Sequence, residues 1–237
     1  MLVTNFNVKY RLYTIVTAIY QLFDVGRIHP VRERELRALK SSVDYIEAKM
    51  PDAMGFKTQK ELISFALTEI GDGHLLELGV FRGGTARFMA KRIGSRTLHG
   101  FDSFEGLPEK WGGFDLGKGA LTMHGKLPRV PDNVVLCKGW FSDTLPVWSK
   151  ANPGLIAFMH IDCDIYSSTV DIFRDLASQI GPGTIVLFDE YFNYPNWENH
   201  EYKAWKEFAE SRGIAYTYLG FARQQVALRV DSVGKSS

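Results

Sequence analysis

The chain has 237 residues, of which 45% are hydrophobic and 23% charged, and its formal net charge is +1. These values are typical of a globular protein and give no global positive field, so we expect neither nucleic acid nor an anionic membrane as a partner. The two cysteines, Cys137 and Cys163, lack a metal-binding spacing, and we expect buried free thiols and a reducing, cytoplasmic location.

The N-terminal part of the chain is predicted to be helical. Residues 8–23 form an apolar-rich pattern that is too short and too polar for a membrane span, and we expect an amphipathic helix there. That helix would pack on the domain or on a second subunit, which favours a homodimer. Two prolines bracket another predicted helix at 31–50. We therefore expect a helical extension over residues 1–56 and one α/β domain over 57–237.

From residue 57 onward, helical segments alternate with short apolar runs. This alternation predicts a Rossmann-like α/β fold, with a mostly parallel sheet and helices on both faces. Two final runs around Gly220 predict a C-terminal antiparallel hairpin. The predicted strands are His74–Leu78, Arg96–Phe101, Val134–Cys137, Leu155–Ile161, Thr184–Phe188, Ile214–Leu219 and Phe221–Arg229, and the helices lie near 57–70, 83–93, 142–149, 167–180 and 197–211.

The turn after the first strand of the alternating region predicts a nucleoside site. Gly79 opens a glycine-rich turn, and Asp102 stands at the end of the next strand, where an acid can accept hydrogen bonds from a ribose. The pattern E-x-G-x-x-x-G differs from the G-x-G-x-x-G of NAD proteins. Glu77 suits a ligand amine and would repel a pyrophosphate, so S-adenosylmethionine is favoured over NAD. Thr85 and Ser103 complete this part of the predicted site.

The third strand of the alternating region ends in a cluster of aromatic and polar residues. Trp140, Phe141 and Ser142 follow it at the edge of the sheet where nucleotides bind. We expect them to enclose an adenine. The alternative is that both aromatic rings belong to the hydrophobic core.

Four acids follow the next two predicted strands. Asp162 and Asp164 come after one, and Asp189 and Glu190 after the other. Carboxyl ends of parallel strands share one edge, so the four side chains should converge. A hard divalent cation would neutralise them, and a remaining carboxylate could act as a general base. The alternatives are capping of the helix at 167–180 by Asp162 or Asp164, or salt bridges to Lys or Arg.

Four motifs in this order resemble the macrocin O-methyltransferase family. They are Glu77–Thr85 (ELGVFRGGT), Asp102–Pro108 (DSFEGLP), Gly139–Pro146 (GWFSDTLP) and His160–Thr169 (HIDCDIYSST). The resemblance implies a class I methyltransferase domain with a seven-stranded sheet. It also implies transfer of a methyl group from S-adenosylmethionine to a hydroxyl, typically of a sugar in a natural product.

The resemblance also implies roles for the acids and for the long loop. It makes Asp162, Asp189 and Glu190 ligands of Mg²⁺ and Asp164 the general base, although the family usually has Asp-Asp where this chain has Asp189-Glu190. The glycine-rich segment 103–131 resembles a lid over a small-molecule acceptor such as a glycoside.

Three other functions remain open from the residues. A metal-independent methyltransferase would use Asp164 as a simple base for a phenol or amine. A nucleoside-binding module without catalysis would not need four convergent carboxylates. An NAD oxidoreductase would bind a different nucleotide.

Overall fold

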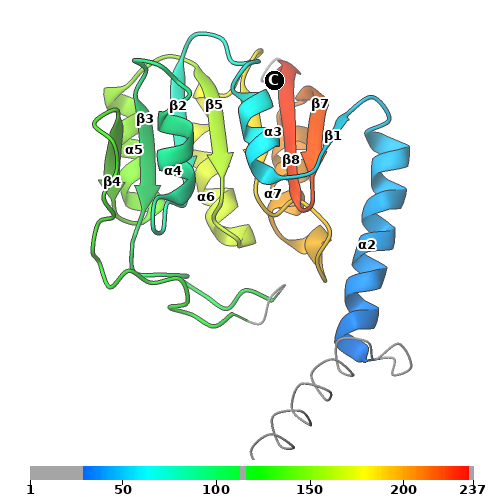
Figure 1. Cartoon of the computed structure of the whole chain (residues 1–237). Helices are drawn as coiled ribbons and strands as arrows, with labels where there is room; N and C mark the ends of the chain where they lie inside the picture. The colour runs from blue at the N-terminus through cyan, green and yellow to red at the C-terminus, as the bar shows by residue number, and fades with distance from the viewer. Residues whose placement is uncertain (1–28, 113–115, 235–237) are drawn as a thin grey trace, which may run out of the picture.

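The computed structural model describes residues 29–112 and 116–234, and the helix predicted at 8–23 lies outside this part. Eight strands form one sheet in the order β1-β7-β8-β6-β5-β2-β3-β4 (Figure 1). The strands are β1 (Met54–Phe56), β2 (His74–Leu78), β3 (Leu98–Asp102), β4 (Val134–Lys138), β5 (Ile156–Ile161), β6 (Ile185–Phe188), β7 (Ala215–Ala222) and β8 (Gln225–Ser232). The α-helices are α2 (Pro30–Lys49), α3 (Gln59–Ala66), α4 (Gly84–Ala90), α5 (Phe141–Ala151), α6 (Tyr166–Leu176) and α7 (Glu201–Ser211), and short 3₁₀ turns cover Ala177–Gln179 and Trp197–Asn199.

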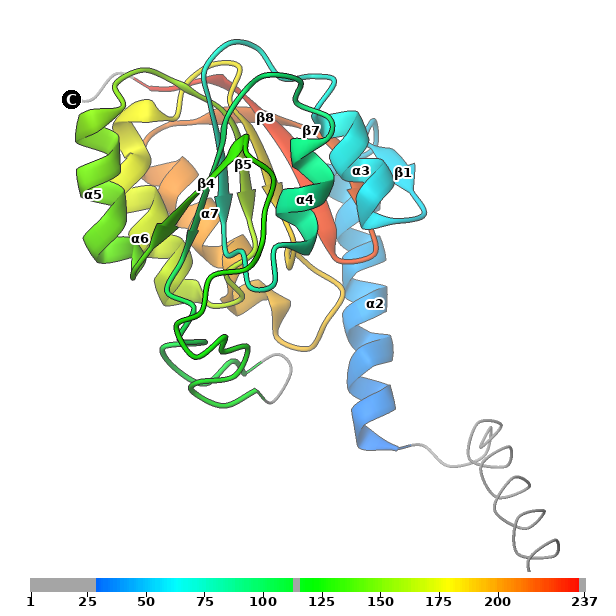
Figure 2. The same cartoon turned by 60° about the vertical axis from the view of Figure 1, so that its left-hand side comes forward.

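Helices cover both faces of the sheet, as the alternating pattern predicts. Helices α3 and α4 pack on one face and α5, α6 and α7 on the other (Figure 2). The central strands β5 and β6 are buried along their whole length. Their continuous apolar sequences therefore reflect burial on both sides. The Rossmann-like α/β prediction is confirmed.

The sheet has one strand more than the seven implied by the resemblance. β1 pairs in parallel with β7 and lies inside the segment expected to be purely helical. It was missed because three partly exposed edge residues carry no period-2 signal. The C-terminal hairpin is confirmed, but its turn lies at Arg223, not at Gly220. A Cβ at Gly220 would lie 2.9 Å from the carbonyl oxygen of Met54, so this glycine serves strand packing instead of a turn.

Helix α2 packs on the domain through hydrogen bonds of its serine and tyrosine hydroxyls. The hydroxyl oxygens of Ser41 and Ser42 accept hydrogen bonds from the Trp197 indole and the Asn193 amide, at 3.0 and 2.8 Å. The hydroxyl of Tyr45 also contacts that of Tyr218 on β7. Among the described helices, none combines the length and apolarity that a membrane crossing requires.

The carboxyl ends of β2, β3, β4, β5 and β6 meet at one edge of the sheet. The connection between β3 and β4 spans residues 103–133 and extends below this edge (Figure 1). Both free cysteines are also near it: Cys137 is half-buried in β4, and Cys163 is buried just past the end of β5 instead of within a strand.

Candidate active site

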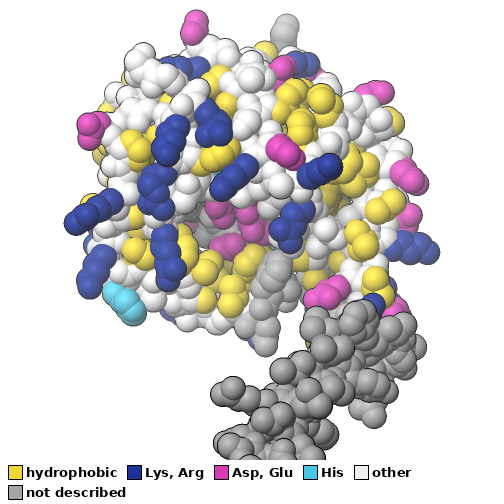
Figure 3. Space-filling view, in the orientation of Figure 1, with side chains coloured by type: hydrophobic (Ala, Val, Ile, Leu, Met, Phe, Trp, Pro, Cys, Tyr) yellow, Lys and Arg dark blue, Asp and Glu magenta, His cyan; other side chains and the backbone are white. Residues whose placement is uncertain are grey.

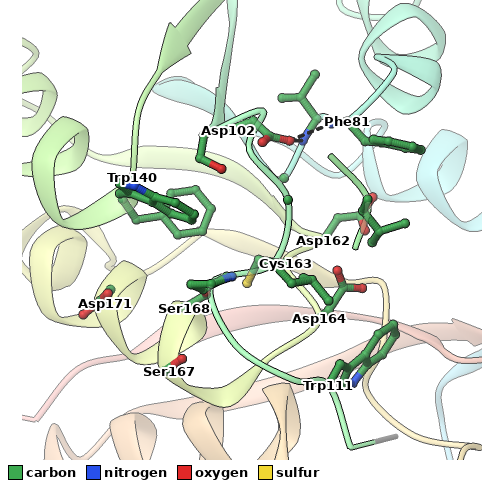
Figure 4. A pocket seen from close by; sticks show the side chains of 18 of the residues that line it. Phe81, Asp102, Trp111, Trp140, Asp162, Cys163, Asp164, Ser167, Ser168 and Asp171 are labelled. Carbon is green, nitrogen blue, oxygen red and sulfur yellow. Dashed lines mark hydrogen bonds between the residues drawn. The ribbon is translucent and has the colours of Figure 1, made fainter. Parts of the chain in front are cut away.

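A cavity of about 550 Å³ opens at this edge of the sheet. One end is formed by the turns after β2, β3 and β4, and the other by α6 and the β3–β4 connection (Figure 4). Nine of the twelve predicted site residues line it: Gly79, Asp102, Ser103, Trp140, Phe141, Ser142, Asp162, Asp164 and Glu190. The other three, Glu77, Thr85 and Asp189, are not among its lining residues; Glu77 is fully buried, whereas the Asp189 side chain is 13% exposed. The structure therefore brings both predicted halves of the site into one cavity.

Asp102 holds together the turns that form the cofactor end. Its Oδ2 atom accepts hydrogen bonds from the backbone amides of Val80 and Phe81 at 2.8 and 2.7 Å, and its Oδ1 atom accepts one from Phe104 at 2.6 Å (Figure 4). A carboxylate has about four acceptor positions, so little capacity remains for a ligand. The carboxylate predicted to bind a ribose thus also fixes the glycine-rich turn.

Gly79 is required by the chain itself. Its φ of +104° is unfavourable for other residues, and a Cβ there would overlap the carbonyl oxygen of Asp162. Glu77, two residues earlier in β2, is fully buried and accepts a hydrogen bond from the hydroxyl of Thr85. Both Glu77 and Thr85 therefore support the cavity wall from behind.

Two aromatic residues lie at the mouth of the cavity. Trp140 is 41% exposed, which excludes the alternative that its ring is a core residue. Phe141 begins α5 and packs partly against the main core cluster. Figure 4 shows the Trp140 ring on the side of the cavity that carries Asp102. A planar group bound there would have one exposed aromatic neighbour ready to stack.

The acids form two overlapping groups. Ligand atoms of Asp162, Asp164 and Glu190 lie within 4.8 Å of one another, and so do those of His160, Asp162 and Asp189. Asp162 is common to both groups. Neither Asp162 nor Asp164 caps α6, whose N-cap is Ile165 without a side-chain bond, so the capping alternative is wrong.

Burial and mutual repulsion change how these acids titrate. Burial and the charge of Asp189 raise the pKa of Asp162 well above its usual value. Burial, together with the charges of Asp189 and Asp102, raises the pKa of Asp164 to about 7. Burial also raises the pKa of Glu190, whose Oε2 atom has no hydrogen-bond partner among the described residues. A carboxylate cluster of this kind is stabilised by a cation.

His160 lies beneath the acids, fully buried between two carboxylates. Its Nε2 atom is 3.5 Å from Oδ1 of Asp189, and its Nδ1 atom is 3.6 Å from Oε1 of Glu77. Burial opposes a charged imidazole, but Asp189 and Glu77 outweigh it and raise the pKa of His160 well above its usual value. The same contact lowers the pKa of Asp189 against the effect of its own burial. His160 does not reach the cavity and is badly placed to serve as a base.

The structure adds site residues that the sequence analysis did not single out. Gln59 at the start of α3 donates a hydrogen bond to Asp189. Glu201 at the start of α7 accepts hydrogen bonds from the turns after β5 and β6. Trp111 and Leu107, from the β3–β4 connection, pack with Ile165 over the cavity. Gln59 and Glu201 come from segments outside the sequence motifs, so only tertiary folding reveals them. Ser167, Ser168 and Asp171 of α6 line the same end.

The surface around the cavity combines both charges. Figure 3 shows acidic side chains inside a hollow and Lys and Arg side chains surrounding it. Local charge therefore differs between the floor and the rim, although the whole chain is nearly neutral.

Solved structures share this architecture. The O-methyltransferase NovP superposes with a TM-score of 0.56 at 24% identity, covering 73% of this chain and 79% of NovP. CalS11, a calicheamicin methyltransferase, gives 0.58 at 19% identity, covering 84% and 91%. At these identities the likeness establishes the class I O-methyltransferase fold.

Sequence relatives include O-methyltransferases that act on natural products. The 8-demethyl-8-(2,3-dimethoxy-α-L-rhamnosyl)-tetracenomycin-C 4'-O-methyltransferase of Streptomyces olivaceus is 33% identical over 141 residues, 50% of this chain and 53% of that protein. Demethyldecarbamoylnovobiocin O-methyltransferase of Streptomyces niveus is 28% identical over 162 residues, 58% and 61% of the two chains. The matched part thus spans between about half and three-fifths of these relatives.

A family description, macrocin-O-methyltransferase (TylF), matches residues 33–219. This range includes all four sequence motifs, the whole cavity wall and every strand from β1 to β6. The chain therefore belongs to the macrocin-O-methyltransferase (TylF) family.

Proposed function

We propose that this chain is an S-adenosylmethionine-dependent O-methyltransferase that uses a divalent metal ion, Mg²⁺ by preference, and acts on a hydroxyl of a sugar-bearing small molecule. One observation carries the proposal: a nucleoside-type end, with Asp102 and Trp140, and a cluster of three carboxylates share one cavity of about 550 Å³. Membership of the family supports it.

The cofactor end fits S-adenosylmethionine. Trp140 and Phe141 would enclose the adenine, with Ser142 beside it, and Asp102 and Ser103 would face the ribose. Gly79 and the turn after β2 would lie against the methionine part. Because Glu77 and Thr85 are behind the wall, their proposed contribution is to hold this turn and the adjoining floor in place.

The acid cluster fits a hard divalent cation. Asp162, Asp189 and Glu190 would hold it, with Asp162 in the middle, because its ligand atoms lie within 4.8 Å of those of Glu190 in one group and of those of Asp189 in the other. Carboxylate oxygens are the ligands that Mg²⁺ prefers, and Glu190 has a buried oxygen without a partner among the described residues. When bound, the ion would bind the acceptor hydroxyl and lower its pKa. Glu190 stands where the family usually has Asp, and its carboxylate still lies within 4.8 Å of that of Asp162.

Asp164 is the proposed general base. Its pKa of about 7 is close to neutral pH, which suits a group that must accept a proton there. The acceptor O–H proton passes to the Asp164 carboxylate as the acceptor oxygen forms a bond to the methyl carbon. The bond from that carbon to sulfur would break at the same time, and its electron pair would stay on sulfur, which turns the positive sulfonium into a neutral thioether. The cavity contributes mainly by aligning oxygen, methyl and sulfur.

The acceptor end supports a small molecule with both polar and apolar parts. Ser167, Ser168 and Asp171 offer hydrogen-bonding groups, while Leu107 and Trp111 offer an apolar wall. Such a mixture suits a glycoside, whose ring carries hydroxyls above an apolar face. The relative from Streptomyces olivaceus, whose name includes a rhamnosyl group, favours the same class.

The proposal is tested by incubating the protein with S-adenosylmethionine and a panel of rhamnosylated and other glycosylated small molecules. Mass spectrometry should detect the gain of one methyl group by an acceptor, and the gain should be lost with a chelator and restored by Mg²⁺. Methylation that is unaffected by the chelator would instead support the metal-independent alternative. Failure to bind S-adenosylhomocysteine in calorimetry would refute the cofactor assignment.

A further inference from the structure

One buried carboxyl group joins the two turns that carry the acid cluster. Glu201, the first residue of α7, is fully buried. Its Oε1 atom accepts a hydrogen bond from the backbone amide of Cys163 at 3.4 Å, and its Oε2 atom accepts one from the backbone amide of Glu190 at 3.1 Å. The side chain thus spans the gap between the segments that follow β5 and β6.

The two backbone amides that Glu201 contacts belong to the turns that carry the four acids. Cys163 lies between Asp162 and Asp164, and the Glu190 amide belongs to the peptide unit that follows Asp189. The last backbone bond between the two strands is from the Asp189 amide to the Ile161 carbonyl, at 2.8 Å. Beyond that point the strands no longer fix the spacing of the turns, and Glu201 connects them.

The helix that presents Glu201 is itself firmly packed. Trp205, one turn further along α7, is fully buried, and its ring lies 5.5 Å from that of Phe173 and 5.8 Å from that of Phe188. The Glu201 carboxyl group is therefore fixed from outside the sheet. Burying a fifth acid beside four others is unfavourable, which argues that its bridging geometry is needed.

We infer that Glu201 is a positioning residue that sets the spacing between the β5 and β6 turns and thereby the arrangement of Asp162, Asp164 and Glu190. The inference rests on the proposed function in that this arrangement is taken to be the metal and base site. Glu201 does not line the cavity, so it acts through the turns and not on a substrate.

Two substitutions of Glu201 separate positioning from general folding. Glu201→Gln is nearly isosteric but offers one acceptor oxygen, and its amide nitrogen would face a backbone N–H as a second donor. Glu201→Asp keeps both oxygens on a shorter chain. Glu210→Gln, on the same helix with a 72% exposed side chain, is the matched control.

The first measurement is amide hydrogen exchange of the segments around Cys163 and Glu190, below the unfolding temperature of each variant. Exchange there should be at least about tenfold faster in Glu201→Gln, partly restored in Glu201→Asp and unchanged in Glu210→Gln. Unchanged exchange in Glu201→Gln would overturn the inference. This result does not depend on whether the protein binds a metal.

The second measurement is calorimetric titration with Mn²⁺ as the probe. Loss of a group that orients metal ligands typically weakens affinity about 10- to 100-fold. We expect that loss in Glu201→Gln, with S-adenosylhomocysteine affinity unchanged. Wild-type affinity for Mn²⁺ in Glu201→Gln would contradict the inference. Absence of Mn²⁺ binding by the wild type would instead refute the metal part of the proposed function, and hydrogen exchange would still decide the role of Glu201.

Discussion

The Nε2 atom of His160 lies 3.5 Å from the Oδ1 atom of Asp189, beneath the acid cluster and away from the cavity. The opposite nitrogen of the ring faces Glu77 at 3.6 Å. One buried imidazole therefore links the carboxylate behind the cofactor turn to a proposed metal ligand. The first prediction concerns what happens when this link is removed.

His160→Asn should strongly destabilise the fold. The substitution leaves Glu77 and Asp189 buried without their cationic neighbour, and breaking a buried ion pair typically costs about 3–5 kcal/mol. Urea denaturation of the metal-free protein measures the loss. His124→Asn, at an exposed position of the β3–β4 connection, serves as the control. A loss no larger than that of the control would mean that His160 is neutral in the folded protein.

Asp102→Asn should weaken both the fold and cofactor binding. The new amide has one acceptor oxygen where the carboxylate accepts three backbone hydrogen bonds. Unsatisfied buried donors cost about 1–3 kcal/mol each. Thermal unfolding and calorimetry with S-adenosylhomocysteine give the two effects separately. Unchanged affinity in a variant that is still folded would remove Asp102 from the cofactor site.

In the metal-free protein, the buried carboxyl groups of Asp164 and Glu201 should make a contribution to stability that decreases as the pH rises. Burial raises the pKa of Asp164 to about 7 and that of Glu201 to about 8. In the unfolded chain both carboxyls lose their protons at lower pH, so the native state binds more protons between about pH 4 and 8, and ionisation there costs stability. Mg²⁺ should therefore raise the unfolding temperature more at about pH 8 than at about pH 5. An equal rise at both pH values would show that Mg²⁺ binds without competing with protons at the cluster, and therefore binds elsewhere.

The β3–β4 connection should become more open when its contact with α6 is removed. The hydroxyl of Ser167 donates a hydrogen bond to Oε1 of Glu109 at 2.7 Å. Ser167→Ala should increase hydrogen exchange in residues 103–112 and 116–131, and bound S-adenosylhomocysteine with an acceptor should reduce it in the wild type. Exchange that is the same in all these states would mean that the connection is not a lid.

Much of the site was predictable because it follows the strand ends. Long apolar runs predicted β5 and β6. Because the carboxyl ends of parallel strands lie at one edge of the sheet, the sequence also predicted that Asp162 and Asp189 lie close together. The role of Trp140 was ambiguous, because a Trp that follows a strand can either pack in the hydrophobic core or contact a bound ligand. Its exposure decides between them.

The remainder depends on tertiary contacts that leave no local pattern. From the sequence alone, Glu201 is an acidic residue in the first turn of a helix, where acids are common, so it does not indicate a site. Gln59 reads as a helix residue, and its contact with Asp189 crosses 130 positions of the chain. β1 forms because β7 offers an edge to pair with and not because Met54–Phe56 favours a strand. The domain boundary at residue 56 stays a prediction.

The central claim, that Asp164 is the base beside a metal held by its neighbours, is tested most directly by one paired measurement. Single-turnover methyl transfer and Mg²⁺ affinity are compared in Asp164→Asn and in Asp171→Asn, which alters another acid of the same cavity. Asp164→Asn should lose about 10²- to 10⁴-fold in rate while binding Mg²⁺ and S-adenosylmethionine as the wild type does. A variant that loses Mg²⁺ affinity but regains the wild-type rate at saturating Mg²⁺ would make Asp164 a ligand, and a wild-type rate throughout would place the base elsewhere.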